Sequence, residues 1–240
     1  VLLYATLHLA SSITAHIVFD SFIQPSEQEL ATAFSYLASN GAKDLILDLR
    51  YNGGGYLNIA QQLASYIAGN AYKGNDFIRL TFNSNHQSSN GTIPLISTDS
   101  PLSLSRILFI TSRGTASASE SVMNGLVPFM NVISIGDTTD GKPVGMSTGD
   151  IGKKYFIAPI TFKYVNKNGE GDFFDGIAPD VLISDDISHD FNDRQELCLK
   201  AAISYLETGS VSGKSFKEFK RHPQYSEKPE WMKNAFFPAR

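Results

Sequence analysis

Apolar residues recur along the chain at two spacings, one typical of helices and one of strands. From Ser26 to Asn40 they fall three or four positions apart, which predicts a helix ended by Asn40-Gly41. Ser26 with Glu29 three residues later matches a capping box at its start. The same spacing predicts further helices over residues 59–67, 117–130 and about 193–207.

Short runs of β-branched and aromatic residues predict strands between these helices. They cover residues 13–23, 45–49, 77–82, 106–111, 132–135, 155–164 and 181–184. Several are apolar without alternation, as in strands buried on both faces. Because strands and helices alternate, the chain is expected to form an α/β fold with helices covering a largely parallel sheet. The polar stretch Asn83–Ser105 is expected to be a surface or active-site loop.

Composition indicates one globular domain. The chain has 240 residues, 42% of them hydrophobic and 18% charged, which is enough to bury a sizeable core. No repeat, low-complexity run or linker divides it, so residues 1–240 are expected to form a single domain. Its core covers about residues 13–207, and residues 208–240 form an extension that wraps the surface.

Charge and cysteine content exclude several classes of function. The net charge of -4 supplies no basic face for a phosphate backbone, so we expect no nucleic-acid partner. Cys198 is the single cysteine, which rules out an internal disulfide, a thiolate zinc cluster and an iron-sulfur site. The five histidines lack metal-ligand spacing, and we expect neither a metal nor a cofactor. The apolar stretch Val1–Phe19 is interrupted by polar residues, so it is a poor membrane span.

A serine-rich segment, Arg113–Glu120, lies between a predicted buried strand and a predicted helix. Its small residues would allow a substrate backbone to come close. Ser117 would lie at the helix N-terminus, where free backbone amides and the helix dipole can stabilise an oxyanion. The alternative is that these serines only cap the helix.

A second segment, Asp137–Gly145, holds Lys142 between a glycine and a proline, which would fix its backbone. A lysine acts as a base only when its pKa falls from about 10.4 to about 7–8, which requires burial away from carboxylates. Asp137 and Asp140 would oppose that shift if they contacted Lys142. The alternative is a solvated lysine in a turn.

A third segment, Asp48–Gly55, ends a predicted strand in consecutive glycines, which usually means that a ligand or another backbone approaches closely. A dinucleotide loop is excluded because Asn58 occupies its last glycine position. A structural turn remains open. In the functional interpretation, the amides of Gly54 and Ala118 hold the oxyanion.

One competing motif is disfavoured. Residues 145–149 match G-x-S-x-G, but that nucleophile elbow needs a helix after it, whereas a β-rich segment follows here. None of the five histidines is assigned to a Ser-His-Asp triad.

Taken in order, the three segments resemble those of the C-terminal processing peptidases, also called tail-specific proteases. That family has an Asp-Leu-Arg-x-Asn-x-Gly-Gly turn, an Ala-Ser-Ala-Ser-Glu segment and then a Gly-Lys loop. Its nucleophile corresponds to Ser117, and its lysine base, 25 positions later, corresponds to Lys142. Gly176–Asp180 looks like the Gly-Ile-x-Pro-Asp segment of the family. The resemblance covers roughly residues 13–207.

The resemblance implies a serine endopeptidase with a Ser-Lys dyad, acting on polypeptides through an acyl-enzyme. It also implies a spiral ββα core like that of Clp protease and crotonase, and export to the cell envelope or periplasm. The implied catalytic residues are Ser117, Lys142, Gly54 and Ala118. The implied substrate-binding residues are Gly53, Gly55, Thr115, Ala116 and Glu120.

Two departures from the family pattern keep rival interpretations open. The glutamine that often follows the lysine by four positions is replaced by Met146, and the segment before Ile13 is too short for the PDZ domain of many members. Met146 favours a non-catalytic relative that binds peptides or apolar ligands. An acyl-CoA enzyme of crotonase-like fold is disfavoured, because nothing basic marks a phosphate site.

Overall fold

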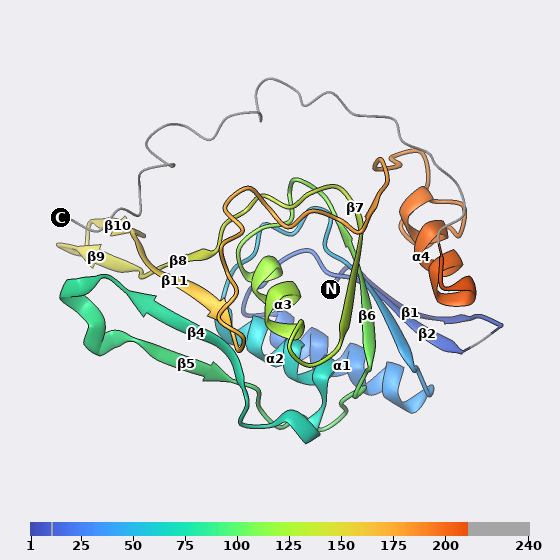
Figure 1. Ribbon diagram of the computed structural model, residues 1–240, viewed down its shortest axis with the longest axis horizontal. Helices are drawn as coiled ribbons and strands as arrows, with labels where there is room; N and C mark the ends of the chain where they lie inside the picture. Colours follow the sequence, from blue (N-terminus) through green and yellow to red (C-terminus); the bar gives the residue numbers. More distant parts are fainter. Residues whose placement is uncertain (11, 211–240) are drawn as a thin grey trace.

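A six-stranded sheet forms the centre of the protein in the computed structural model, which describes residues 1–10 and 12–210 (Figure 1). Its order is β1-β2-β3-β6-β7-β12, and every neighbouring pair is parallel except β1 with β2. The strands are β1 Leu3–His8, β2 Ile13–Val18, β3 Asp44–Asp48, β6 Arg106–Thr111, β7 Asn131–Gly136 and β12 Val181–Leu182. The predicted, largely parallel sheet is therefore confirmed, with one antiparallel edge strand, β1, that the sequence did not reveal.

Helices cover both faces of this sheet, which explains the continuous apolar runs of its strands. Leu45 and Leu47 of β3 lie in the core that also contains side chains of α1, α2 and α3, whereas Ile46 faces the core under α4. The helices are α1 Ser26–Ser39, α2 Leu57–Ala68, α3 Ala118–Leu126 and α4 Leu197–Thr208, with short 3-10 turns η1 Asn70–Tyr72 and η2 Ser84–Ser89.

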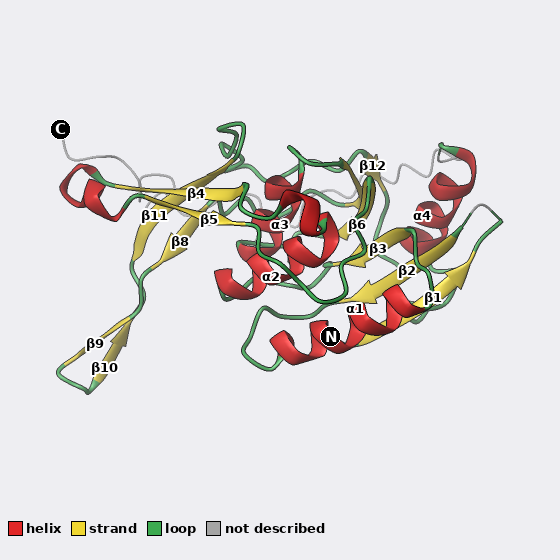
Figure 2. Cartoon of the chain, turned by 90° about the horizontal axis from the view of Figure 1, so that it is seen from below, coloured by secondary structure: helices red, strands yellow, loops and turns green. Residues whose placement is uncertain are grey.

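A second, antiparallel sheet lies beside the first and corrects two predictions. Its order is β5-β4-β11-β8, built from β4 Asp76–Phe82, β5 Gly91–Pro94, β8 Val144–Met146 and β11 Ile160–Asn166. The expected loop 83–105 therefore contains η2 and β5. The single strand expected over 155–164 is two, β10 Tyr155–Ile157 and β11. β10 pairs with β9 Gly149–Ile151 in a hairpin that projects from the body (Figure 2).

The helix boundaries also differ from the sequence patterns at specific points. The capping box is wrong, because the Ser26 hydroxyl donates to the carbonyl of Ser21 (2.8 Å) and Pro25 is the N-cap. α3 ends at Leu126, four residues before the predicted end. α4 begins at Leu197, since the carboxylate of Glu196 accepts the amide protons of the first turn. Most of the predicted extension, residues 211–240, lies outside the described residues.

Within the described residues, no helix combines the length and apolar character that crossing a bilayer requires.

We expect the protein to lose stability as the pH falls from neutral toward 4, because of His16. Its imidazole is buried on β2, and among the described residues its Nε2 has no hydrogen-bond partner. Burial lowers the pKa of His16 from 6.5 to about 4. Between these values the unfolded chain binds the proton first, so stability falls as the pH falls. Denaturant unfolding at pH 7 and pH 4.5 should differ by roughly 2 kcal/mol from this group.

His16→Gln is the matching variant, since it keeps a polar side chain without an imidazole. It should remove most of that difference; an unchanged pH dependence would exclude His16 as the cause.

Candidate active site

Ser117 lies where β6 leads into α3, as the N-cap residue of the helix. Its backbone has φ 57° and ψ -112°, a conformation that non-glycine residues rarely adopt and that other contacts must hold in place. The Ser117 N–H donates to Glu120 Oε2 (2.8 Å), and its carbonyl accepts from the N–H of Ser121 (2.8 Å). The residue is partly exposed. The predicted position at a helix start is confirmed.

The amide of Ala118, next to this serine, makes no hydrogen bond to the described residues. It is the first amide of α3, so the helix itself supplies no acceptor and the dipole adds positive potential there. An N–H of this kind is a suitable donor to a developing negative charge beside Ser117.

Gly54 also lies close to Ser117 and Ala118, but its N–H does not have the expected role of oxyanion donor. Its N–H donates to Asn52 Oδ1 (2.9 Å), so this amide is already committed and the expected oxyanion donor needs correction. A Cβ on Gly54 would lie 2.8 Å from both the Ala118 nitrogen and the Ser117 Cβ. The absence of a side chain is what allows the glycine turn to pack against the serine.

Asn52 fixes that turn and was not singled out by the sequence patterns. Its side-chain amide donates to the Phe19 carbonyl (2.8 Å), and its own carbonyl accepts from Ala116 N–H (3.1 Å) and the Ser119 hydroxyl (2.9 Å). The side chain is fully buried. A buried asparagine between a strand and a glycine run is a signal that could have indicated this role.

Gly54→Ala should therefore damage both stability and activity. The new Cβ would lie 2.8 Å from the Ala116 carbonyl oxygen, the Ala118 nitrogen and the Ser117 Cβ, and φ of +100° is unfavourable for alanine. We expect a loss of at least about 1–3 kcal/mol in the free energy of unfolding, together with loss of any activity at Ser117. Gly53→Ala is the matched control for stability, because its added Cβ would meet nothing within 4 Å. Equal melting temperatures for the two variants would contradict this account.

Lys142 lies in the loop between β7 and β8. A Cβ on Gly141 (φ 85°) would come within 2.4 Å of the Gly176 nitrogen, so the segment around Gly176 packs directly against the lysine loop. Thr139 strengthens this contact, since its hydroxyl accepts from the N–H of Ile177 (2.8 Å). The predicted Gly176–Asp180 segment thus supports the loop that carries Lys142.

The carboxylate of Glu120 joins the serine and lysine segments. Oε2 accepts from the N–H groups of Ser117 and Lys142, both at 2.8 Å. Oε1 accepts from the Gly141 N–H (2.7 Å) and the Thr139 hydroxyl (2.6 Å). Four donors aimed at one carboxyl group are the pattern of its ionised form. Burial raises the pKa of Glu120, and these four bonds oppose the rise.

The expected substrate-binding set divides by burial. Glu120 is 0% exposed, so its assignment as a substrate contact is wrong and it belongs to the internal scaffold. Thr115 is likewise buried, with its hydroxyl donating to the Leu49 carbonyl (2.7 Å). Gly53 and Gly55 are exposed and Ala116 is partly exposed, which leaves them accessible to a ligand.

The environment of Lys142 shifts the pKa of its amine. Burial lowers the pKa of Lys142 below its ordinary value, while the charges of Asp140 and Glu120 oppose that shift. Asp137 instead pairs with Arg113 Nε (3.8 Å). Among the described residues, no hydrogen bond or ion pair engages the Lys142 amine.

A buried ion network fixes the end of β3, from which the glycine turn starts. Arg50 pairs through two nitrogens with Asp48 (2.7 Å at the closest) and through Nη1 with Asp185 and Glu196, both at 2.8 Å. Because Glu196 also caps α4, the network ties the turn to that helix. A buried guanidinium needs such partners.

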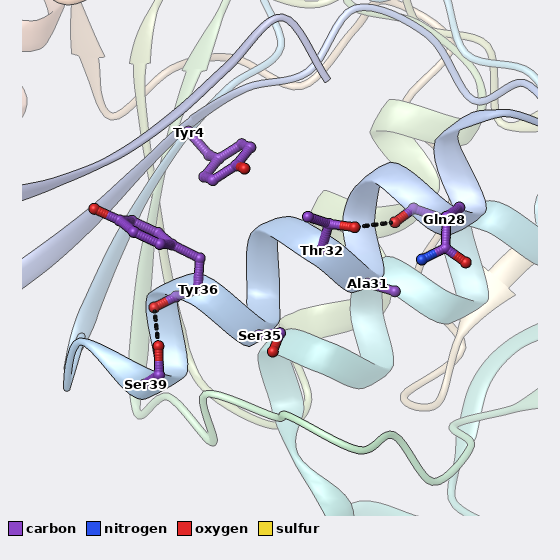
Figure 3. A pocket seen from close by; sticks show the side chains of 7 residues that line it. All are labelled: Tyr4, Gln28, Ala31, Thr32, Ser35, Tyr36 and Ser39. Carbon is purple, nitrogen blue, oxygen red and sulfur yellow. Dashed lines mark hydrogen bonds between the residues drawn. The ribbon is translucent and has the colours of Figure 1, made fainter.

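A groove of about 510 Å³ lies between β1 and the outer face of α1, apart from the candidate active site (Figure 3). Two of its hydroxyls, those of Thr32 and Ser39, donate to carbonyls of α1. It contains none of the candidate catalytic residues. Its lining is Tyr4, Gln28, Ala31, Thr32, Ser35, Tyr36 and Ser39.

Comparison with known proteins identifies the family. A sequence profile of peptidase family S41 matches residues 13–183, more than half of the chain, so the chain belongs to this family. The carboxy-terminal processing protease CtpA of Bacillus subtilis (strain 168) is 27% identical over 162 residues, which cover 67% of this chain and 33% of CtpA. The chloroplastic C-terminal processing peptidase of Tetradesmus obliquus is 26% identical, over 65% of this chain and 32% of its own length. The predicted resemblance is confirmed.

Solved structures support the same fold. The crystal structure of a Bacteroides fragilis protein assigned to the S41 proteases superposes with a TM-score of 0.80 at 23% identity, over 85% of this chain and 56% of that one. The mixed α/β architecture is thus shared with S41 protease structures. This chain spans about a third of the length of the curated relatives it matches.

Proposed function

We propose that this chain is the catalytic domain of a serine endopeptidase in which Ser117 is the nucleophile and Lys142 the general base. The observation that carries the proposal is the single Glu120 oxygen that accepts from the backbone of both residues. That bond brings segments far apart in the sequence within hydrogen-bond reach of one atom. Membership of a peptidase family supports peptide hydrolysis as the reaction.

The proposed reaction passes through an acyl-enzyme. The neutral amine of Lys142 takes the proton of the Ser117 hydroxyl as Oγ attacks the carbonyl carbon of the peptide bond. The Ala118 amide donates to the oxygen that becomes negative. The ammonium of Lys142 then protonates the leaving amine as the C–N bond breaks. Water, deprotonated by Lys142, hydrolyses the remaining ester and releases the carboxylate product.

The proposed substrate is a polypeptide in extended conformation. β8 is an edge strand of the antiparallel sheet and begins two residues after Lys142, so its free edge could pair with a substrate backbone near the dyad. Gly53, Gly55 and Ala116 lie accessible on the serine side. Larger side chains at these three positions would narrow the path for the substrate.

Several finer expectations belong to the same proposal. We propose that the α/β core is the spiral ββα arrangement of Clp protease and crotonase, supported by the family match. Export to the cell envelope and the absence of a nucleic-acid partner remain predictions. They follow from the resemblance and from the net charge of -4.

A non-catalytic relative of the same fold is the alternative function. Met146 favours it, because this side chain is 42% exposed at the end of β8 and offers the lysine no strong hydrogen bond. Incubation with a fluorophosphonate followed by peptide mass spectrometry separates the two functions. An adduct on Ser117 supports the peptidase. Intact Ser117 in folded protein, together with binding of an unstructured peptide, supports the binding module.

A further inference from the structure

The two residues of the proposed dyad lie on different connecting segments. Ser117 lies between β6 of the central sheet and α3, whereas Lys142 lies between β7 of the central sheet and β8 of the antiparallel sheet. Their separation therefore depends on groups that connect these two segments. Glu120 is one of them, extending from α3 to the amides of the lysine loop.

Tyr164 reaches in the opposite direction, from the antiparallel sheet to the serine. It lies on β11, and the single proton of its hydroxyl is shared between the carbonyls of Ser117 (2.9 Å between the oxygens) and Lys142 (3.2 Å). Its own N–H donates to the Pro143 carbonyl (3.2 Å), so the residue holds the lysine loop at two points. We propose that Tyr164 is a positioning residue that holds Lys142 against Ser117, an inference that rests on the proposed function.

The Tyr164 hydroxyl can donate its hydrogen bond over the whole pH range in which the proposed base would work. Complete burial raises its pKa well above the ordinary value of 10, so the group stays a protonated donor wherever the proposed base is active. The two acceptors depend on it unequally. The Ser117 carbonyl also accepts from Ser121 N–H, whereas among the described residues the Lys142 carbonyl accepts no other bond. Loss of the hydroxyl should therefore loosen mainly the lysine.

Tyr164→Phe is the direct test, because phenylalanine keeps the ring packing and removes only the hydroxyl. In the variant, the rate of Ser117 labelling by a fluorophosphonate should fall about 10- to 100-fold, the effect of a small misplacement of a reacting group. The pKa of Lys142, followed by ¹⁵N NMR of its amine, should rise toward the ordinary lysine value as the loosened loop admits water.

Phe173→Leu is the matched control. Its ring packs edge-on against Tyr164 at 6.1 Å, so the substitution weakens packing while the hydroxyl bonds remain. It should lower the melting temperature without moving the pKa of Lys142. A Tyr164→Phe variant that loses stability like the control, with unchanged labelling and lysine pKa, would overturn the inference. The parent protein could remain unlabelled while the pKa of Lys142 still changes in Tyr164→Phe. That result would reject the proposed peptidase function and would support the role of Tyr164 in positioning Lys142.

Discussion

Ser117→Ala should abolish cleavage of an unstructured polypeptide, lowering kcat by about 10³-fold or more. Alanine removes the hydroxyl of the proposed nucleophile, which lies next to the Ala118 amide, a group that makes no hydrogen bond to the described residues. The fold should survive, because the Ser117 backbone keeps its bonds to Glu120 and Tyr164, and only the side-chain half of the capping box with Glu120 is lost. Cleavage is followed by gel electrophoresis of a labelled, unfolded substrate protein.

Ser147→Ala is the control for this experiment. Ser147 is the central residue of the G-x-S-x-G match, but it lies between β8 and β9 with its hydroxyl on Thr161 (2.7 Å). We expect full activity in this variant. If Ser147→Ala is inactive and Ser117→Ala is active, the nucleophile is Ser147 of the competing motif and not Ser117.

Lys142→Met should lower kcat by about 10²- to 10⁴-fold, the usual contribution of a general base. Methionine has similar length and no ionisable group, so it should fill the same space without disturbing the bonds that the Lys142 backbone makes to Glu120 and Tyr164. Because the amine is partly buried, its removal should leave the melting temperature unchanged or higher.

Lys163→Met is the control, because it removes a nearby lysine that is not the proposed base. Lys163 lies on neighbouring β11, opposite Val144, and its side chain is exposed. It should keep parental activity. A Lys142→Met protein that cleaves as fast as Lys163→Met would show that another group, or water, takes the serine proton.

The fold was predictable where local pattern decided it. α1, β3 and β6 follow from apolar spacing within a single segment, and their observed bounds lie within a residue of the predictions. The antiparallel sheet was missed because β4 pairs with β11, far away in the sequence, through residues such as Arg79 and Val165 that show no strong alternation. The predicted capping box at Ser26 was wrong because the Ser26 hydroxyl donates to the carbonyl of Ser21 in the preceding loop.

The sequence motifs indicated the proposed reacting groups but not the contacts that hold them, and the catalytic roles of these groups stay predictions. Motif spacing identified Ser117 and Lys142, which the structure brings to one carboxylate. Glu120 was wrongly assigned as a substrate contact because burial, which excludes that role, is a tertiary property. Tyr164 carried no signal at all, since its partners are backbone carbonyls that every residue possesses. Gly54 was correctly marked as a point of close approach, yet the direction of its N–H is set by Asn52.

The pH dependence of Ser117 labelling tests the central claim most directly, since a fluorophosphonate reports the reactivity of the serine without a peptide substrate. In the parent, the labelling rate should rise with pH through one ionisation below the ordinary lysine pKa of about 10.4, because burial favours the neutral amine of Lys142. In Lys142→Met this ionisation should vanish and the rate should stay low across the range. Equal rates and an identical pH profile in the two proteins would contradict the assignment of Lys142 as the base.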